Sequence, residues 1–366
     1  MSRPFARLSR GYSKPYRAII NKRDLLDSRT KAEGASIAFY KPSRPAKGRL
    51  RAPFDSADYL NGLYYALLEG RFVFDFVHQE DLSAETLAKY RALLIPNAAY
   101  FRDSECATVH EYAARGGSVL ATFETSRYNE WGERREDFGL AGVFGANALG
   151  ETLGPQDNTY MRIEQRHAVT SGFEGTELLP GAESRVAVKA VQTAPLVLSV
   201  VPHYPWYPPE MVYPRATKTT EPAVILRQDG RSRIAYFPGD IDRTFWVSGN
   251  TDLSLVLQNT VRWVLGDSRQ PARVRGEGII EIFAWETEPG YALHLLNYTN
   301  PNMTRGFIRR FYPIGPQQVE FDIAPGKTIS DVRALRASRS LPFTQSDRAV
   351  SFEVPSVTDY EVIALT

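Results

Sequence analysis

The chain has 366 residues, of which 43% are hydrophobic and 12% aromatic, so it can bury the cores of two or three domains. Its 44 Lys and Arg nearly balance its 42 Asp and Glu, and this formal charge of +2 gives no signal for a nucleic-acid partner. The single cysteine excludes an internal disulfide, and no window approaches the ~20 apolar residues of a membrane-spanning helix. Because the N-terminus also lacks the apolar stretch of a signal peptide, we predict a cytoplasmic protein with no membrane partner.

Residues 1–34 form a predicted basic N-terminal arm. Basic side chains continue to residue 51, and the acids within this stretch are Asp24, Asp27 and Glu33. An arm that binds nucleic acid is one interpretation. Aromatic residues are not interleaved with the charges as base stacking requires, so we favour a solvated arm that lies along another domain.

From residue 35 the chain alternates apolar strands with helices. The predicted strands are 35–40, 72–77, 92–97 and 118–124. The predicted helices are 56–69, 82–90 and 103–115. Ser83 is placed to cap the second helix, and Asp103 or Ser104 the third. Uniformly apolar strands between helices indicate a parallel sheet covered on both faces, so we predict an α/β fold of the flavodoxin-like or class I glutamine amidotransferase-like type.

The second half of this domain has a weaker pattern. Residues 125–180 are Gly-rich and predicted to be irregular, apart from a short helix at 136–145. Strands are expected within 183–202 and 222–238. A helix at 252–266 then packs back on the sheet and completes an α/β domain of residues 35–266.

After Gly266 the helical pattern stops. Residues 279–299 predict a hairpin around Glu288-Pro289-Gly290. The later runs VEFDI, AVSFEV and YEVIAL alternate apolar and polar residues with turn residues between them. We therefore predict a small antiparallel β-sandwich domain over residues 267–366.

One short segment resembles a catalytic elbow without its nucleophile. Phe123 to Ser126 follows a predicted strand, where class I amidotransferases carry a reactive cysteine on a strand-to-helix turn. Here this position offers Glu124, and the cysteine, Cys106, lies on the preceding helix. Cys106 and His110 share a helix face, which we interpret as ordinary helix surface rather than a nucleophile pair. Amidotransferase activity is therefore not expected.

Polar residues gather at the predicted carboxyl edge of the sheet, where open α/β sheets bind ligands. The strand 231–240 ends in a Pro-Gly turn that is predicted to present a short loop, and a second strand ends at the same edge. Carboxylates and arginine suit sugar hydroxyls, and tryptophan suits the apolar face of a pyranose. The other interpretation is an internal Asp–Arg pair that fixes the loop, with the tryptophan in the core. The ligand-binding candidates are Glu124, Arg127, Asp240, Asp242, Arg243 and Trp246.

Two further hypotheses rest on single features. Glu124 with Asp240 or Asp242 would supply the two carboxylates of a glycoside hydrolase, if the spacing allows. The aromatic and proline-rich segment 203–214 fits a carbohydrate platform, a partner contact or a rigid loop packed on its own domain. The histidines are scattered, and no metal-binding, GxGxxG or Walker-type pattern occurs, so we expect no metal and no cofactor.

Several stretches carry a family resemblance. YLNGLYYALLEGRFVFDFVHQEDL, YRALLIPNAAYF, ARGGSVLATFETS and RIAYFPGDIDRTFW resemble the trimerisation-type middle domain of family 42 β-galactosidases. FAWETEPGYALHLLNYTNPNMTRG and the β domain after it resemble related, poorly characterised glycoside hydrolases. The resemblance covers most of residues 35–366.

The resemblance implies an accessory role. Such proteins carry their catalytic carboxylates in a (β/α)8 barrel, and those residues have no matching positions in this sequence. The expected function is therefore a non-catalytic oligomerisation and carbohydrate-site module in carbohydrate metabolism. It is expected to act with a separately encoded or lost barrel and to assemble as a homotrimer. The alternatives are a glycoside hydrolase in its own right and a stand-alone sugar-binding protein.

Overall fold

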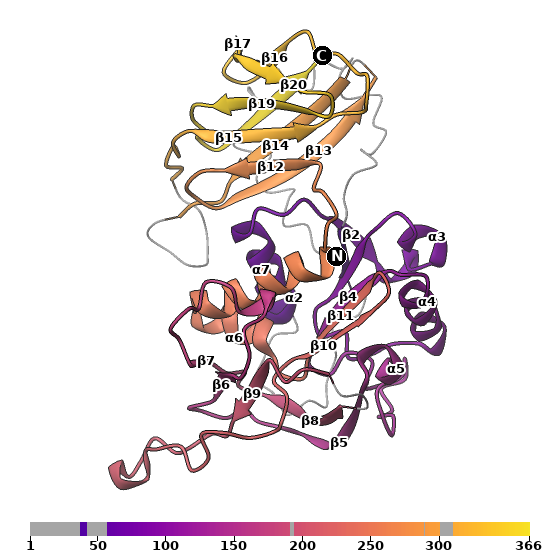
Figure 1. The fold of residues 1–366 in the computed structure, drawn as a ribbon, viewed down its shortest axis with the longest axis vertical. Coiled ribbons are helices and arrows are strands. Elements are labelled where there is room, and N and C mark those ends of the chain that lie inside the picture. The colour runs from indigo at the N-terminus through magenta and orange to yellow at the C-terminus, as the bar shows by residue number, and fades with distance from the viewer. Residues whose placement is uncertain (1–36, 42–56, 191–193, 289, 301–309) are drawn as a thin grey trace. The chain divides into compact units, whose positions relative to one another are not determined.

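The computed structural model describes residues 37–41, 57–190, 194–288, 290–300 and 310–366, so the predicted basic arm lies outside the described residues. These residues form two compact units (Figure 1). The α/β unit contains residues 36–70 and 74–269, and the β unit contains residues 270–366 together with 71–73.

The α/β unit is built on a six-stranded sheet with the order β10-β11-β4-β3-β1-β2. Its strands are β1 (Ile37–Lys41), β2 (Asp75–His78), β3 (Ala92–Ile95), β4 (Ser118–Thr122), β10 (Ile225–Asp229) and β11 (Ser232–Phe237). The neighbours from β2 to β11 are parallel, and β10 is antiparallel to β11 at the edge. The predicted parallel sheet is therefore confirmed, with one antiparallel edge strand added.

Helices cover both faces of this sheet, as the apolar strands predicted. The helices of one face are α2 (Ala57–Glu69), α6 (Ile241–Ser248) and α7 (Thr251–Leu265), which pack on one another. The helices of the other face are α3 (Ala84–Leu87), α4 (Asp103–Ala114) and α5 (Ala141–Phe144) (Figure 1). All residues of β3 and β4 are buried between these two layers, which explains why their sequences contain no alternating polar positions.

The end of one helix and the start of another differ from expectation. Ser83 caps α3 as predicted, because its side chain accepts a hydrogen bond from the Thr86 amide, but the helix ends after one turn at Leu87. The caps predicted for α4 are wrong. The N-cap is Arg102, whose amide donates to the Glu105 carboxylate at 2.7 Å, so the acid three residues further on stabilises this helix start.

The segment predicted to be irregular contains three strands. These are β5 (Ala146–Leu153), β6 (Tyr160–Ile163) and β7 (Leu178–Pro180). β5 pairs with β8 (Arg185–Ala190), and β6 lies between β7 and β9 (Leu198–Val201). The prediction was wrong because β5, with the sequence ANALGETL, is poor in the β-branched and aromatic residues that mark strands. The predicted helix at 136–145 shrinks to α5.

The β unit consists of two antiparallel sheets with one shared apolar core. One sheet has the order β12-β15-β19-β18, and the other β13-β14-β20-β16-β17. Their bounds are β12 (Ala272–Arg275), β13 (Ile280–Thr287), β14 (Gly290–Asn297), β15 (Gln317–Asp322), β16 (Val332–Ala334), β17 (Arg339–Ser340), β18 (Phe343–Gln345), β19 (Ala349–Val354) and β20 (Tyr360–Leu365). Thr287 pairs with Gly290, which confirms the predicted hairpin. None of the helices in the described parts of the chain is long and apolar enough to cross a membrane.

Helices α2 and α6 approach each other closely at Gly62. A Cβ atom added to Gly62 would overlap the backbone carbonyl of Asp242. Only a residue without a side chain fits this contact, so Gly62 sets the distance between the two helices and the position of the first turn of α6.

Gly62→Ala should destabilise the chain, although alanine normally favours a helix interior by about 0.5–1 kcal/mol over glycine. The new methyl group forces α2 and α6 apart, and we expect a loss of about 1–3 kcal/mol in the free energy of unfolding, measured by chemical denaturation. The control Asn61→Ala changes the neighbouring half-buried residue of the same helix and should be neutral or slightly stabilising. A Gly62→Ala variant as stable as the parent would contradict the close approach.

Candidate functional site

The two candidate segments leave the same edge of the sheet. β4 and β11 are parallel neighbours, with Thr122 opposite Phe237 in the register. Glu124 and Asp240 each follow shortly after one of these residues. The expectation that both segments end at the carboxyl edge is therefore confirmed.

The predicted short loop after β11 is a helix. Asp240 occupies the N-cap position of α6, and Gly249 ends the helix with a left-handed φ of 67°. Asp242 and Arg243 thus lie in the first helical turn. The side chain of Trp246 is half-buried and packs on Tyr65 of α2 with 4.8 Å between ring centroids, so it lies between helices instead of standing free in a loop.

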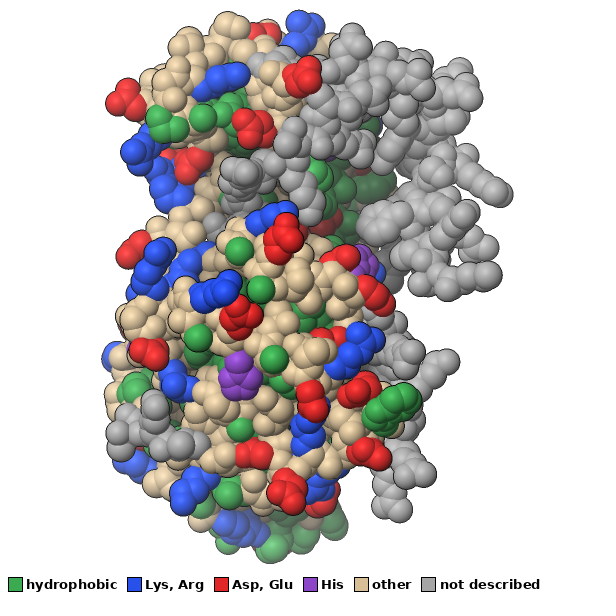
Figure 2. Space-filling model, turned by 90° about the vertical axis from the view of Figure 1, so that its right-hand side faces the viewer, with side chains coloured by type: hydrophobic (Ala, Val, Ile, Leu, Met, Phe, Trp, Pro, Cys, Tyr) green, Lys and Arg blue, Asp and Glu red, His purple; other side chains and the backbone are tan. Residues whose placement is uncertain are grey.

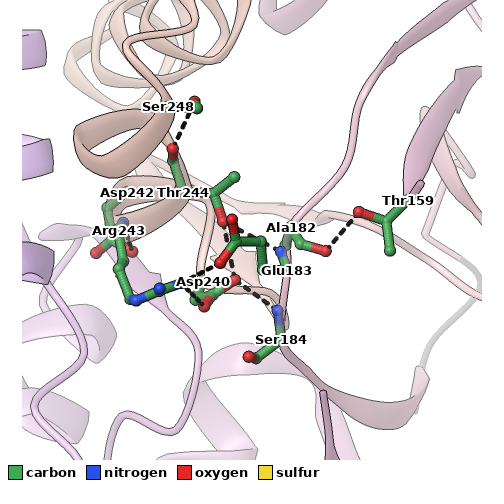
Figure 3. A network of polar contacts seen from close by, with 9 residues as sticks. All are labelled: Thr159, Ala182, Glu183, Ser184, Asp240, Asp242, Arg243, Thr244 and Ser248. Atoms are coloured by element: carbon green, nitrogen blue, oxygen red, sulfur yellow. Dashed lines mark hydrogen bonds and ion pairs between the residues drawn. The ribbon is translucent and has the colours of Figure 1, made fainter. Parts of the chain in front are cut away.

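Arg243 is the centre of a buried polar network (Figure 3). Its Nη1 atom donates to Asp240 Oδ2 at 3.0 Å and to Glu183 Oε2 at 2.8 Å. Asp240 also accepts hydrogen bonds from the Ser184 amide at 2.8 Å and from the Thr244 hydroxyl at 3.1 Å. Asp240 is 0% and Arg243 2% exposed, so this pair joins α6 to the segment before β8 from inside the protein.

Asp242 joins α6 to the sheet. The Thr122 hydroxyl at the end of β4 donates to Asp242 Oδ2 at 2.6 Å, and the Arg243 amide donates to Oδ1 at 2.9 Å. The side chain is 0% exposed. Both carboxylate oxygens are therefore satisfied by the protein itself.

Burial changes the protonation of both aspartates. Loss of water raises the pKa of Asp240 to about 6 and that of Asp242 to about 7. The hydrogen bond from Ser184 and the nearby Arg243 charge oppose this rise at Asp240. No arginine side chain is among the main groups that lower the pKa of Asp242, and the Asp240 charge raises this pKa further.

The segment after β4 is a series of turns, so the predicted strand-to-helix elbow is not formed as expected. Phe123 has a left-handed φ of 51°, which is rare for an aromatic residue. Its ring stacks on Tyr59 of α2 with 5.9 Å between centroids. The strained position, where an elbow enzyme holds its nucleophile, thus carries a phenylalanine, and Glu124 lies one residue further on.

The Glu124 carboxyl group is 0% exposed and points into the protein. Its Oε1 atom accepts a hydrogen bond from the Thr152 hydroxyl, and Oε2 has no hydrogen-bond partner among the described residues. Burial raises the pKa of this carboxyl group, while Thr152 and Arg127 lower it in part. Arg127 donates to the backbone carbonyls of Glu136 and Gly150, so it holds the turns around Glu124 together.

Tyr59 connects the two groups of candidate residues. Its pKa is raised by burial and then by the charges of Asp240 and Asp242, with a smaller contribution from Glu124. The three carboxylates are therefore near enough to this one tyrosine of α2 for their charges to raise its pKa. Sequence reasoning missed Tyr59 because it is one apolar-face residue of an ordinary amphipathic helix.

A small cavity lies next to Asp240, against its neighbours Gly239 and Ile241. This cavity of about 20 Å³ lies between the ends of β6 and β11 and is lined by residues that include Met161, Ala182, Arg185, Phe237 and Ile241. A cavity of this size holds about one water molecule. It cannot hold a sugar ring in this conformation.

The other sequence candidates show no reactive arrangement. Cys106 is buried, which raises the pKa of its thiol to about 11 and keeps it protonated at neutral pH. The His110 ring nitrogen Nε2 lies 3.2 Å from the carbonyl oxygen of Gly139. Among the residues that the structure describes, no group of three or more His, Cys, Asp or Glu could hold a metal ion.

Several residues of the network were not foreseen. They are Thr122, Thr152, Glu183, Ser184 and Thr244. Each is a common polar residue in a strand, a turn or a helix, and nothing in its sequence neighbourhood marks it. Figure 2 shows charged side chains of both signs interspersed on one face of the molecule, without a continuous basic area among the described residues there.

Solved structures share this fold, although no protein-family model and no curated protein sequence matches the chain. α-L-Fucosidase isoenzyme 2 from Paenibacillus thiaminolyticus is 16% identical, with a TM-score of 0.65, and the match covers 90% of this chain and 48% of that one. β-Galactosidase from Bacillus circulans sp. alkalophilus is 14% identical, with a TM-score of 0.58 and coverages of 93% and 42%.

A catalytic mutant of Gan42B, a GH42 β-galactosidase from G. stearothermophilus, is 16% identical, with a TM-score of 0.57 and coverages of 90% and 40%. The chain thus spans less than half the length of each of these proteins. At these identities the match shows the fold alone: a mixed α/β unit and an antiparallel β unit that also occur as a part of glycoside hydrolases.

Proposed function

We propose that this chain is a non-catalytic oligomerisation and carbohydrate-site module related to glycoside hydrolases, with a role in carbohydrate metabolism. The observation that carries the proposal is the extent of the structural match. Proteins named as a fucosidase and as β-galactosidases share this fold over 90–93% of this chain, but over only 40–48% of their own lengths. Because proteins named for different sugars share this part, we infer that it supports a sugar site without determining the reaction.

The topology supports a finer assignment of the fold. The parallel strand order β2-β1-β3-β4-β11, with β3 in the middle, is that of flavodoxin-type doubly wound sheets. We assign the α/β unit to the flavodoxin-like and class I glutamine amidotransferase-like folds on this basis. Phe123 at the strained position after β4 supports the absence of amidotransferase chemistry.

The burial of the carboxylates supports a structural role for them. A glycosidase needs two carboxyl groups that flank the scissile bond of a bound sugar. Glu124, Asp240 and Asp242 are each 0% exposed, and the neighbouring cavity has room for one water molecule. Hydrolysis through these residues and stand-alone sugar binding through Arg243 and Trp246 are therefore the less supported alternatives.

The proposed assembly is a homotrimer that acts with a separately encoded (β/α)8 barrel, so that a carbohydrate would bind at the border between chains. We expect light scattering of the purified chain to give about three times the monomer mass of 41.1 kDa. A mass of one chain at all concentrations would contradict the assembly role and make sugar binding the next function to test by calorimetry against oligosaccharides.

The purified chain should not hydrolyse chromogenic β-galactosides or α-fucosides. Glu124→Gln keeps the shape of the side chain and removes its charge, so it should show the same background rate as the parent chain. Glu130→Gln, at an exposed position of the following turn, is the matched control. Turnover by the parent that Glu124→Gln abolishes and Glu130→Gln retains would establish the hydrolase alternative instead.

A structural Asp242 predicts a specific pH dependence of stability. Its pKa rises from an ordinary 3.8 to about 7 in the folded chain, so the folded state holds the proton more tightly than the unfolded state. The free energy of unfolding should therefore fall as the pH rises from about 4 to 7. In Asp242→Asn, which cannot ionise, this contribution is lost.

Urea denaturation of both proteins at pH 4, 5, 6 and 7 measures this difference. The stability of Asp242→Asn relative to the parent should rise across this range by up to a few kcal/mol, because each pKa unit corresponds to about 1.4 kcal/mol. A difference that does not change with pH would show that Asp242 is already ionised in the folded chain at pH 4.

A further inference from the structure

The connection between β9 and β10 extends away from the α/β unit as a long arm (Figure 1). We call residues 202–221 the aromatic arm. Near its far end lies a short 3₁₀ helix, η5 (Pro209–Met211). The arm starts from an ordered base, where the Asn158 side chain donates to the Tyr204 carbonyl at 3.1 Å and the rings of Tyr160 and Tyr204 stack with 6.2 Å between centroids.

We call residues 206–215 the tip of the arm. Contacts within the tip fix its shape. Arg215 Nη1 donates to the carbonyl oxygens of Met211 and Tyr213 at 2.9 and 2.7 Å. Its guanidinium group also lies over the Tyr213 ring, 4.0 Å from the centroid. Five prolines at positions 202–214 restrict the backbone further. A partner that binds this tip therefore has little conformational entropy to remove.

The tip exposes large apolar side chains. Trp206 is 69% and Tyr207 79% exposed, and the remaining members of this set are Met211, Val212 and Tyr213. Between residues 203 and 214 the one charged side chain is Glu210. Tryptophan, tyrosine, methionine and arginine with few charges form the composition of interface cores between proteins. The tip is thus an apolar interaction surface with one acidic group, Glu210, and one basic group, Arg215, whose guanidinium is held by the Met211 and Tyr213 carbonyl oxygens.

The β5–β8 sheet of the same chain carries an exposed apolar side chain near a basic one, which complements the apolar tip with its acidic Glu210. The inner face of this sheet packs Val186 and Val188 into the core of the α/β unit. On the outer face, Leu149 of β5 is 61% exposed.

Lys189 of β8 is exposed opposite Asn147, two residues before Leu149. Glu151, two residues after Leu149 on the same face, forms an ion pair with Arg134, so Lys189 is the basic group near the leucine that this pair does not engage. We call Asn147, Leu149 and Lys189 the outer face.

We propose that the aromatic arm docks on the outer face of a second copy of this chain, with the apolar tip against Leu149 and Glu210 near Lys189. The tip and the outer face are different surfaces, so each copy offers one to the next and receives the other. Such a head-to-tail contact closes into a ring when the rotation between copies allows it. This inference rests on the proposed oligomerisation and names the surfaces that produce it.

Two variants separate the two surfaces. The tip variant carries Trp206→Ser and Tyr207→Ser, and the face variant carries Leu149→Ser and Lys189→Glu. All four side chains are exposed, so both variants should fold like the parent. Leu178→Ser, at an exposed position of β7 outside both surfaces, is the control.

Sedimentation velocity of each protein and of an equimolar mixture tests the inference. The parent and Leu178→Ser should associate, and each variant alone should dissociate at least tenfold more readily. The mixture should form a dimer and nothing larger, because one intact tip meets one intact outer face.

Two results would overturn the inference. If the parent associates and the tip variant does so equally well, the proposed oligomerisation stands and the contact lies elsewhere. If the parent stays a monomer, the oligomerisation itself fails, and the tip is left for another occupant such as a carbohydrate. Variants that dissociate but do not complement each other would also exclude a contact between tip and outer face.

Discussion

The first turn of α6 is the point at which the layers of the α/β unit are joined. Its backbone at Asp242 lies against Gly62 of α2, and its Asp242 side chain accepts the Thr122 hydroxyl of β4. Arg243, the next residue, forms ion pairs with Asp240 and Glu183. Ile241, the preceding residue, is buried in the hydrophobic core. A sheet strand, two helices and the segment before β8 are thus held together within a single helical turn.

This role explains why charged groups occur where water is excluded. A buried carboxylate is costly unless its oxygens are hydrogen-bonded, and removal of one partner of a buried ion pair costs more than the pair contributes. Both oxygens of Asp240 and of Asp242 have protein partners. Glu124 differs, since one of its oxygens has no partner among the described residues. The aspartate carboxylates are therefore fully paired within the protein, whereas Glu124 keeps one oxygen atom without a hydrogen-bond partner among the described residues.

The exposed aromatic arm of the α/β unit favours a role in contacts between proteins. The buried carboxylates of its interior give less support to catalysis. The carboxyl edge of the sheet is filled by its own side chains, whereas the aromatic arm places a rigid apolar tip in solvent. Large exposed apolar groups of this kind mark interaction sites on soluble proteins. The accessory role that we propose would account for both features, since an accessory module needs a stable interior and an outward contact.

Local sequence patterns were enough to predict the alternation of strands and helices in residues 35–124. They also predicted the helix near 252–266 and the change to antiparallel strands after Gly266. These features follow from periods of 2 and 3.6 residues, which depend only on neighbouring positions. The shared sheet edge of Glu124 and Asp240 was also predictable, because parallel strands end on one side. Tertiary structure alone decided that residues 241–248 form a helix, that ANALGETL pairs with β8 and that the candidate carboxylates are buried. Burial and partner choice depend on which distant segments meet, as Thr122 meets Asp242 and Glu183 meets Arg243, and no local pattern contains that information.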